Sequence, residues 1–389
     1  MNTLYALIKR EFERMSKSKL LLVVMFLLPL FFCWVSCETF SKGYSRDIPI
    51  GIIDYDNSNF SRKMTRMLEA CPSLSVDYRP MSLDEGKDLI LRNKVYGLFV
   101  IPKDFEKDIY SKKQPKVVSY FNNQYMLIGS MVSKDITAAI MTFQTELSVG
   151  AKVKTGNISP KQAIIETMPV QVVDYIKGNP YFNYSYFLSA SAFIQIFHII
   201  ACFVTIWAFG SEYKTGSAKE WIEKANNSLA LAMFGKWLVY FVIFMVILLL
   251  CYTIMFVFYG LPLRGSFVFL MFSTAVFLLA YQGAGIAFVE ISGNLRFSLS
   301  AGAFYTSLGF TFAGLTYPAT SMPVLLKLYT YLIPLKSYLK IFYDQTLKDI
   351  NWIYDIKPLL MMVIIILPSI ILAFRLKQMA YDSKYWRRE

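Results

Sequence analysis

The side chains that could do acid–base, nucleophilic or metal chemistry are few and scattered. His198 is the only histidine in the 389 residues, and a lone histidine in an apolar stretch is more often a hydrogen-bonded structural group than a proton relay. Asp54 and Asp56 follow an apolar run, where carboxylates can bind metal but more often form the turn. Ser58 and Ser61 have no plausible base nearby, so a nucleophile role is weakly supported. The residues predict no enzyme active site.

Metal and nucleotide sites are equally hard to find. The five cysteines form neither a CxxC pair nor a cluster with histidine, a pattern that does not fit a zinc site. These cysteines are Cys33, Cys37, Cys71, Cys202 and Cys251. The sequence also lacks the GxxxxGK[ST] loop that cradles nucleotide phosphates. We therefore expect this chain itself to bind no metal, ATP or other cofactor.

Long apolar stretches that are nearly free of charge dominate the chain. Hydrophobic residues make up 55% of it and charged residues 17%, against about 45–50% and about 25% in soluble domains. Six stretches have about the length that a hydrocarbon core of about 30 Å requires. The predicted spans are residues 19–37, 184–210, 234–260, 266–290, 296–317 and 357–375. The sequence thus predicts an α-helical polytopic membrane protein with about six transmembrane helices.

Positive charge is distributed unevenly around these spans. With both termini inside, the cytoplasmic segments carry 15 Lys and Arg and the short outer loops carry 6, as the positive-inside rule requires. Residues 38–183 hold 19 Lys and Arg against 16 Asp and Glu, and we expect this long segment to face outward. The net charge of +13 is therefore a topology signal. No basic stripe interleaved with aromatic residues indicates nucleic-acid binding.

The first span has a basic N-terminal flank, as a signal peptide does. Its apolar stretch is longer than that of a usual signal peptide, however, and no A-x-A cleavage site follows it. We therefore interpret residues 19–37 as a retained membrane helix, with cleavage as the alternative.

Residues 1–18 have the pattern of an amphipathic helix. Apolar residues spaced by four, four and three draw one stripe at Leu4, Ile8, Phe12 and Met15. Basic residues, including Arg10 and Arg14, occupy much of the remaining surface. We predict a cytoplasmic helix in the inner interface with its basic side chains toward anionic headgroups. An ordinary juxtamembrane anchor is the alternative.

Residues 38–183 alternate short apolar runs with helical segments. The runs predict buried strands, and they lie at residues 48–54, 74–78, 96–102 and 116–120. Ser58 and Ser82 stand where helix N-caps stand. Residues 126–150 and 160–177 have the pattern of further helices. Strands that alternate with helices predict an inserted extracytoplasmic α/β domain.

Two connecting segments in the membrane block are distinctive. Residues 211–233 can form a short cytoplasmic helix, which would be suited to receive force from a soluble partner; a structured loop is the alternative. In residues 318–356, prolines break the helix and the apolar part is too short to span. We predict re-entrant or interfacial helices on the outer side, which are tolerated where their backbone is buried in protein. Residues 376–389 are predicted to form a cytoplasmic tail.

Polar side chains inside the predicted spans are few. They are Gln195, His198, Gln282 and, at the end of a span, Glu290, and such groups usually face the interior of a helix bundle. Of these, Gln195, His198 and Gln282 enter the candidate pathway. Together with Phe312 and Tyr317 near the end of the fifth predicted span, these three are our candidates for a substrate pathway or gate.

Four stretches occur in a characteristic order along the chain. Residues 48–61 (IPIGIIDYDNSNFS) and residues 96–105 (YGLFVIPKDF) each combine a strand with a turn. Residues 212–221 centre on Gly216, and residues 314–335 contain the proline turns GLTYP, MP and IPL. In this order they resemble the permease subunits of type-2 ABC exporters, in the subgroup with a large periplasmic domain between the first and second membrane helices.

The resemblance implies which residues would meet an ATPase. A coupling helix would comprise Glu212, Thr215, Gly216, Glu220, Trp221 and Ile222, and an N-terminal interface helix would contribute Arg10, Phe12 and Arg14. Lys214 and Lys219 depart from the family's usual acidic and leucine-rich pattern at this place. That departure leaves open which ATPase is the partner.

The resemblance also implies partners and a location. Two permease subunits, identical or closely related, would form the pathway, and separate ABC ATPase subunits would hold ATP and Mg. In double-membrane bacteria a periplasmic adaptor protein and an outer-membrane channel would join them. The chain would lie in the bacterial inner membrane among its lipids, with no nucleic acid bound. It would export a hydrophobic or amphipathic substrate, such as a drug-like compound or a lipid.

Two other functions are consistent with a membrane protein of this composition. An ion-gradient-driven secondary transporter would be expected to carry more intramembrane carboxylates and an inverted repeat. A membrane-anchored extracytoplasmic binding protein would keep its function in residues 38–183 alone.

Overall fold

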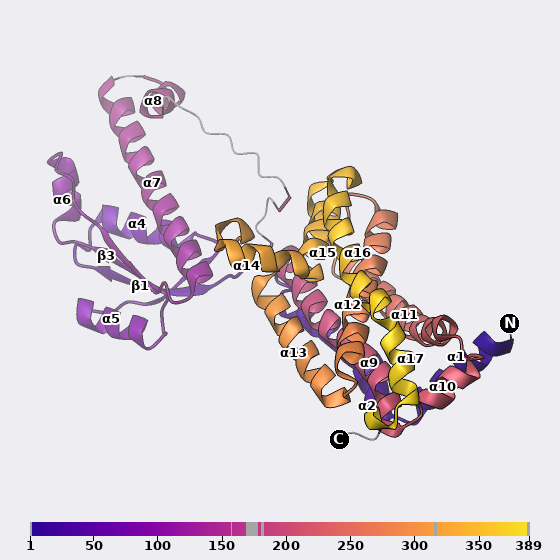
Figure 1. Cartoon of the computed structure of the whole chain (residues 1–389). Coiled ribbons are helices and arrows are strands. Elements are labelled where there is room, and N and C mark those ends of the chain that lie inside the picture. Colours follow the sequence, from indigo (N-terminus) through magenta and orange to yellow (C-terminus); the bar gives the residue numbers. More distant parts are fainter. Residues whose placement is uncertain (1, 157, 169–177, 180–182, 315–316, 387–389) are drawn as a thin grey trace. The chain divides into compact units, whose positions relative to one another are not determined.

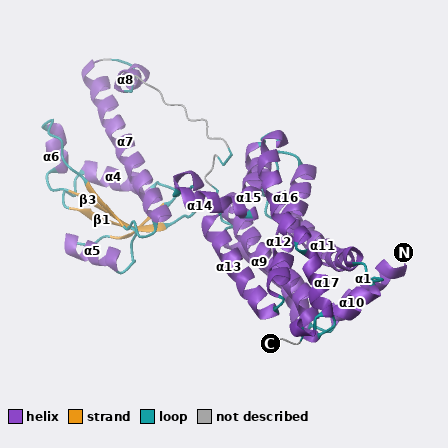
Figure 2. Ribbon diagram, viewed as in Figure 1, coloured by secondary structure: helices purple, strands orange, loops and turns teal. Residues whose placement is uncertain are grey.

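The computed structural model describes residues 2–156, 158–168, 178–179, 183–314 and 317–386 (Figure 1). The chain divides into two compact units. One comprises Met1–Gly43 with Ile176–Glu389, and we call it the helical unit; the other comprises Tyr44–Tyr175, and we call it the sheet unit. Figure 2 shows that all the strands belong to the sheet unit.

The helical unit is built from long apolar helices and a few short ones. Its helices are α1 (Asn2–Ser16), α2 (Lys19–Leu22), α3 (Leu28–Thr39), α9 (Ala190–Thr215), α10 (Ala218–Lys224), α11 (Leu229–Thr253), α12 (Phe267–Ser292), α13 (Leu295–Phe312), α14 (Val324–Tyr329), α15 (Pro334–Tyr343), α16 (Ile356–Ile371) and α17 (Ala373–Tyr381). One π-helical turn, η1 (Val23–Leu27), joins α2 to α3. Two more, η2 (Ser185–Ser189) and η3 (Ile254–Phe258), extend α9 and α11.

Six helical stretches among the described residues are long and apolar enough to cross a membrane. They are Lys19–Thr39, Met126–Gly156, Ser185–Thr215, Leu229–Phe258, Phe267–Ser292 and Trp352–Tyr381. Five of them correspond to predicted spans. The exception is Met126–Gly156, which is α7 of the sheet unit; its Val132, Ile136 and Phe143 are buried in that unit's own core. The fifth predicted span is α13, a helix of 18 residues that is not among the six.

The C-terminal end of α9 and the N-terminal end of α11 extend further than predicted. α9 continues to Thr215 and α11 already begins at Leu229, beyond the boundaries that we predicted at 210 and 234. For α9 the physical reason is that Glu212, the first charge after the apolar stretch, pairs with Lys236 inside the protein and does not have to leave the helix for water. The start of α11 is set by Ser228, whose oxygen caps the helix by accepting a hydrogen bond from the N–H of Leu231.

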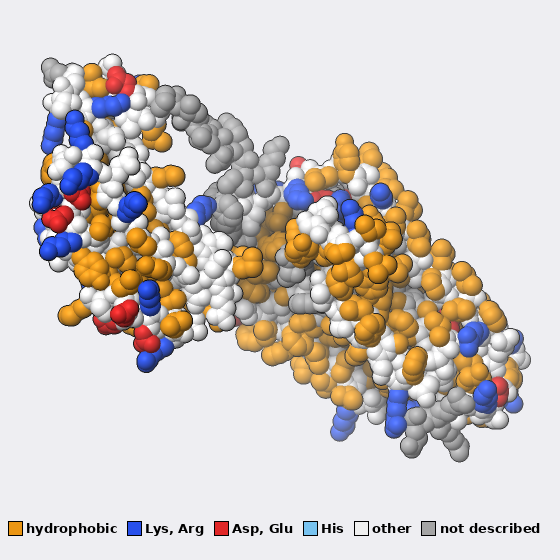
Figure 3. All heavy atoms as spheres, turned by 60° about the vertical axis from the view of Figure 1, so that its left-hand side comes forward, with side chains coloured by type: hydrophobic (Ala, Val, Ile, Leu, Met, Phe, Trp, Pro, Cys, Tyr) orange, Lys and Arg blue, Asp and Glu red, His pale blue; other side chains and the backbone are white. Residues whose placement is uncertain are grey.

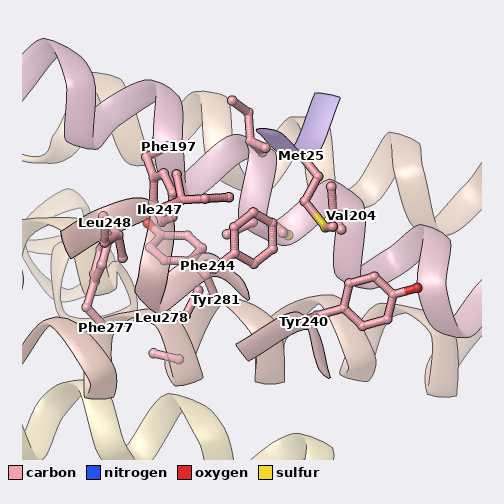
Figure 4. Packing of buried hydrophobic residues seen from close by; sticks show 14 of the residues in the cluster. Met25, Phe197, Val204, Tyr240, Phe244, Ile247, Leu248, Phe277, Leu278 and Tyr281 are labelled. Atoms are coloured by element: carbon pink, nitrogen blue, oxygen red, sulfur yellow. The ribbon is translucent and has the colours of Figure 1, made fainter. Parts of the chain in front are cut away.

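The centre of the helical unit is formed by α9 and α12, which pack against each other and against neighbouring helices. Figure 4 shows aromatic and aliphatic side chains filling this core, with Phe197 against Phe244 and Phe277 against Tyr281. The two helices approach closely at Gly285, where a Cβ would lie 3.0 Å from the carbonyl oxygen of Cys202. A larger residue at this position would therefore require the two helices to move apart by a few tenths of an ångström.

Residues 318–356 divide into an exposed and a buried part. None of the α14 residues is buried, and Val324 and Leu325 are among the most exposed apolar side chains. α15, in contrast, packs against α9, α12, α13 and α16. Its Tyr338 stacks on Phe277 at 4.2 Å and bonds with Thr274 at 2.7 Å. α14 is thus exposed and α15 is packed inside the helical unit; the re-entrant or interfacial placement of these helices stays a prediction.

The surface of the helical unit has an apolar belt. Figure 3 shows hydrophobic side chains covering much of its visible face, whereas Lys and Arg side chains gather toward its ends. Exposed apolar residues such as Val257, Phe258 and Val268 contribute to this surface. Such a distribution is the one that a bilayer imposes on a membrane protein.

The sheet unit contains a four-stranded sheet in the order β2-β1-β3-β4. Its elements are β1 (Ile48–Asp54), α4 (Asn59–Glu69), β2 (Leu74–Tyr78), α5 (Leu83–Leu91), β3 (Gly97–Ile101), α6 (Phe105–Tyr110), β4 (Val118–Phe121), α7 (Met126–Gly156) and α8 (Pro160–Thr167). β1 pairs with β2 and β3 in parallel, and β4 is antiparallel to β3. The strands lie within about two residues of the ranges expected from apolar runs. Part of the predicted helix 160–177 lies outside the described residues.

Helices cover both faces of this sheet. Met64 and Leu68 of α4 and Val132 of α7 share a core with one face. On the other face α5 comes so close that a Cβ on Gly86 would lie 2.6 Å from Leu98. Burial on both faces explains why the two central strands, β1 and β3, are continuous apolar runs, whereas the edge strand β2 alternates apolar and polar residues.

The turn after β1 uses the residues that we had weighed as metal ligands. Asp54 Oδ1 accepts hydrogen bonds from the backbone N–H groups of Asp56 and Asn57, both at 3.0 Å. Asp56 Oδ2 accepts one from the N–H of Glu106 at 3.1 Å. The oxygen of Ser58 caps α4 by accepting from the N–H of Ser61. These contacts are those of a turn and a helix cap.

Candidate functional site

The segment with the coupling pattern begins inside the second long helix. Glu212 and Thr215 lie in the last turn of α9, which ends at Gly216 with φ 74°. The N–H of Ser217 then donates to the carbonyl of Glu212 at 2.9 Å. Because φ is positive there, a glycine suits the position better than any other residue. This sharp end allows the chain to start α10 at once, so that α9, α10 and α11 meet near Glu212.

Glu212 lies at the centre of a group of buried charges. Its carboxylate accepts a pair of hydrogen bonds from Arg10, at 2.7 and 2.9 Å, and one from Lys236 at 2.5 Å. Arg14 also bonds to it. Glu11 completes the group because Lys236 approaches its carboxylate at 2.8 Å. We call these five residues the buried charge cluster.

Burial makes this cluster unusual. The side chains of Glu212 and Lys236 are 0% exposed, and that of Glu11 is 1% exposed. Ions removed from water cost several kcal/mol each unless partners compensate them. Here three cations face two carboxylates, so the cluster has a net charge of +1. Burial lowers the pKa of Arg10, but its hydrogen bonds to Glu212 and the nearby carboxylates outweigh this and raise it overall.

The cluster joins three elements that are far apart in sequence. Arg10, Glu11 and Arg14 come from α1, Glu212 from α9 and Lys236 from α11. Arg14 also donates to Ser211 Oγ at 2.8 Å. Pairs of this kind stay together because separating them would leave a charge buried without a partner. The cluster therefore ties α1 to the last turn of α9 and to the first turns of α11.

The orientation that we expected for the N-terminal helix is wrong for its arginines. Arg10 is 8% exposed and faces Glu212 rather than lipid headgroups. Phe12, expected in the apolar stripe, is 49% exposed. The buried face of α1 instead carries Leu7, Arg10, Glu11 and Met15. The apolar pattern misled because two charged residues, compensated by partners elsewhere in the chain, belong to the buried face.

The short helix α10 has one buried and one charged face. Trp221 and Ile222 are 1% and 0% exposed, and the Trp221 indole donates to the carbonyl of Ala232 at 3.2 Å. Lys236 of the cluster lies 4.8 Å above the Trp221 ring. On the opposite face Glu220 pairs with Lys224 at 2.8 Å, which lowers the pKa of Glu220. Trp221 and Ile222 thus anchor the helix, and its charged side chains remain accessible.

The predicted pathway residues do not form one site. His198 is fully buried, and its ring nitrogens lie 3.3 and 3.4 Å from the carbonyls of Ile194 and Thr306. Gln282 instead accepts a hydrogen bond from Trp237 at 2.9 Å. For His198 these contacts are those of a packed structural group.

The remaining pathway candidates lie elsewhere in the helical unit. Gln195 is 7% exposed on α9. The ring of Phe312 packs against Tyr329 with centroids 5.8 Å apart. Tyr317 is 53% exposed and donates to the carbonyl of Ser321 at 3.3 Å.

Sequence reasoning missed Glu11 and Lys236 as members of the buried charge cluster. A signal was present, because Lys236 is a lone charge within an otherwise apolar helix. A lone intramembrane charge indicates a buried partner. Glu212, the partner, could be singled out from its motif but could not be matched to Lys236 by spacing.

The known proteins that this chain resembles are transporters, which agrees with the membrane-length apolar helices of the helical unit. Residues 19–375 match the family described as "ABC-2 family transporter protein". The chain is also 26% identical over 164 residues to "Probable multidrug ABC transporter permease YbhS" of Escherichia coli strain K12, and equally to the protein of that name in strain O157:H7. The match covers 41% of this chain and 42% of each relative, so the chain spans about two fifths of their length. The family match extends over most of the chain, over four of the five membrane-length helices of the helical unit in full and over most of the fifth, Trp352–Tyr381. The chain therefore belongs to the ABC-2 family of transporter proteins, and it is a multi-pass membrane protein.

Proposed function

We propose that this chain is the permease subunit of an ATP-driven exporter and that α1 and α10 form its contact with the ATPase subunit. The observation that carries the proposal is the buried charge cluster. It fastens the N-terminal helix to the ends of α9 and α11, and its Lys236 lies over Trp221, the anchor of α10. A force applied to α1 or α10 thus reaches two long helices directly.

The exposed face of α10 carries charged side chains that could contact a soluble partner protein. Lys219, Glu220, Glu223 and Lys224 form two ion pairs on its exposed face. Exposed pairs contribute little to stability, about 0–1 kcal/mol. Their charges are therefore free to contribute to recognition, which depends on complementary charge. The proposed partner is an ABC ATPase subunit, which would hold ATP and Mg.

The topology that we propose follows from charge and helix length. Both termini and α10 lie in the cytoplasm, and the sheet unit is an extracytoplasmic domain inserted between the first and second spans. α13 crosses the membrane as the fifth span, since 18 residues at 1.5 Å each extend about 27 Å. The positive-inside bias supports this orientation. The corresponding location is the inner membrane of a bacterium.

We further propose the assembly and the cargo. A second permease copy, identical or closely related, completes the pathway, and a periplasmic adaptor and an outer-membrane channel extend it. The cargo is hydrophobic or amphipathic, which agrees with the word "multidrug" in the relatives' name. The apolar interior of the helical unit suits such a cargo.

The test uses the complex with its ATPase, reconstituted in lipid. Charge reversal on α10 by Glu220→Lys with Glu223→Lys should reduce ATPase coupling or dissociate the ATPase, and thermal unfolding of the permease should not change. Asp88→Lys, on an exposed position of α5, is the matched control. If the α10 variant and the control couple equally well, the contact is elsewhere and the proposal fails.

One observation favours a second candidate, an ion-gradient-driven transporter. Glu290 is 0% exposed, and neither of its carboxylate oxygens has a hydrogen-bond partner among the described residues. A buried carboxyl group of this kind is a feature of proton-coupled transporters. Transport into vesicles that persists without ATP but stops when the proton gradient is dissipated would favour this candidate, and the opposite result would exclude it.

A further inference from the structure

The sheet unit has a cleft at the carboxyl ends of β1 and β2. The pairing of these strands ends with Gly51 opposite Tyr78, whereas β1 continues to Asp54. The unequal ends leave a notch at which Ile52 and Ile53 line a cleft of about 650 Å³. This volume lies within the range of about 300–1,000 Å³ that is usual for ligand pockets. The carboxyl ends of parallel strands are also where open α/β sheets bind ligands.

Three arginines line this cleft. Arg62 and Arg66 belong to α4, and Arg79 follows β2 on the other side. Residues four apart lie on one face of a helix, so Arg62 and Arg66 are neighbours. Two like charges at this spacing repel each other slightly, and an anion between them would remove the repulsion.

The acidic residues of the cleft are already engaged. Asp54 uses one oxygen for the backbone of its own turn and the other for the Ser61 hydroxyl at 2.6 Å. Glu69 pairs with Arg79 at 2.7 Å. Both carboxylates are therefore occupied by contacts that shape the walls of the cleft.

Two of the three guanidinium groups lack a carboxylate partner. Arg62 is held by neutral oxygens, the carbonyl of Asn57 at 2.6 Å and the side chain of Asn59 at 2.8 Å. No ion pair of Arg62 or Arg66 with an acidic side chain occurs within the described ranges of the chain. These contacts fix the position of Arg62 and leave its charge uncompensated.

We propose that this cleft binds a soluble organic anion, whose carboxylate or phosphate group Arg62 and Arg66 recognise. The planar guanidinium group matches such oxyanions with paired hydrogen bonds. The apolar part of the ligand lies against Met81, which is 90% exposed at the rim of the cleft. The cleft lies wholly in the sheet unit, so the proposal does not rest on the transport function.

Binding can be measured on the full chain in lipid nanodiscs. Asp84→Cys, in a Cys71→Ser background, receives an environment-sensitive fluorophore at an exposed position three residues beyond the rim of the cleft; the other four cysteines are buried. Inorganic phosphate and citrate are titrated separately at constant ionic strength, with chloride as the reference anion. We expect a saturable change in fluorescence, and the stronger of the two anions identifies the preferred group.

Matched variants distinguish a site from general charge attraction. Arg66→Gln should weaken binding about tenfold or more, as expected for the loss of one charged hydrogen bond. Arg92→Gln, which removes an exposed arginine directly after α5 and outside the cleft, should leave binding unchanged. Absence of saturation with both anions overturns the proposal, as does an equal loss in the two variants. Saturation only by an acidic peptide also overturns it, and would indicate a protein partner.

Discussion

The substitution Glu212→Gln tests the buried charge cluster directly. It preserves the size of the side chain and removes one of the two carboxylates, so Arg10, Arg14 and Lys236 are left with Glu11 as their only anion. Breaking a buried ion pair costs about 3–5 kcal/mol. The amide oxygen of glutamine still accepts hydrogen bonds, and Arg14 is 19% exposed. We therefore expect a loss near the lower end of that range, about 3 kcal/mol.

The measurement is the free energy of unfolding of the purified chain, by denaturant titration in mixed micelles. A second substitution, Lys236→Met, removes the fully buried cation that faces Glu212. Because an apolar replacement of a whole buried pair is often neutral, the double variant should be more stable than the sum of the single losses predicts. We expect a coupling energy of about 1.5 kcal/mol or more, within the range for residues of one network.

The same variants should separate stability from coupling. In the complex with its ATPase, Glu212→Gln should lower transport per ATP hydrolysed, because α1 is no longer fastened to α9. The reasoning is refuted if Glu212→Gln unfolds within about 0.5 kcal/mol of the native chain, as a surface substitution does. Strict additivity of the two substitutions would refute it equally.

Three further predictions concern the supports of the site and the sheet unit. Trp221→Ala removes a ring that is 1% exposed and should cost about 3–5 kcal/mol in unfolding free energy; a loss under about 1 kcal/mol would mean that α10 is not anchored by it. Gly216→Val places a β-branched residue at φ 74° and should cost about 1–2 kcal/mol, whereas Gly150→Ala, with open space around its Cβ, should not destabilise the chain. Gly97→Val brings a side chain to a position where even a Cβ lies 2.7 Å from Val132; overpacking should destabilise the sheet unit by about 1–3 kcal/mol, and limited proteolysis should then release fragments of residues 44–175 before the helical unit is cleaved.

The sequence alone was enough to predict where most of the helices and strands lie. Charge-free stretches of membrane length gave the long helices because the hydrocarbon core requires about 20 apolar residues. Apolar runs between turn residues gave the four strands, and Ser58 and Ser82 cap α4 and α5 as their positions predict. Hydrophobic period and capping are local properties, so they can be read without knowing what packs against them.

The sequence did not show which face of a helix is buried or which distant residues that face contacts. The stripe on residues 1–18 was drawn from apolar residues only, and it excluded Arg10, which is in fact buried against Glu212. α7 has the composition of a membrane span, yet it packs on the sheet. In both cases the local pattern is real, but the surface that each helix meets comes from a distant part of the chain.

The buried charge cluster was decided by the tertiary structure. Arg10 and Glu212 are 202 positions apart, and Lys236 is a further 24 positions beyond Glu212. No periodicity or spacing in the sequence connects such residues. Each charge can be buried only when a partner of opposite charge lies beside it, and that pairing depends on the tertiary structure. The sequence identified the segment with Glu212 and Gly216 as the predicted contact for an ATPase; only the fold showed that Lys236 and the N-terminal helix hold Glu212 in place.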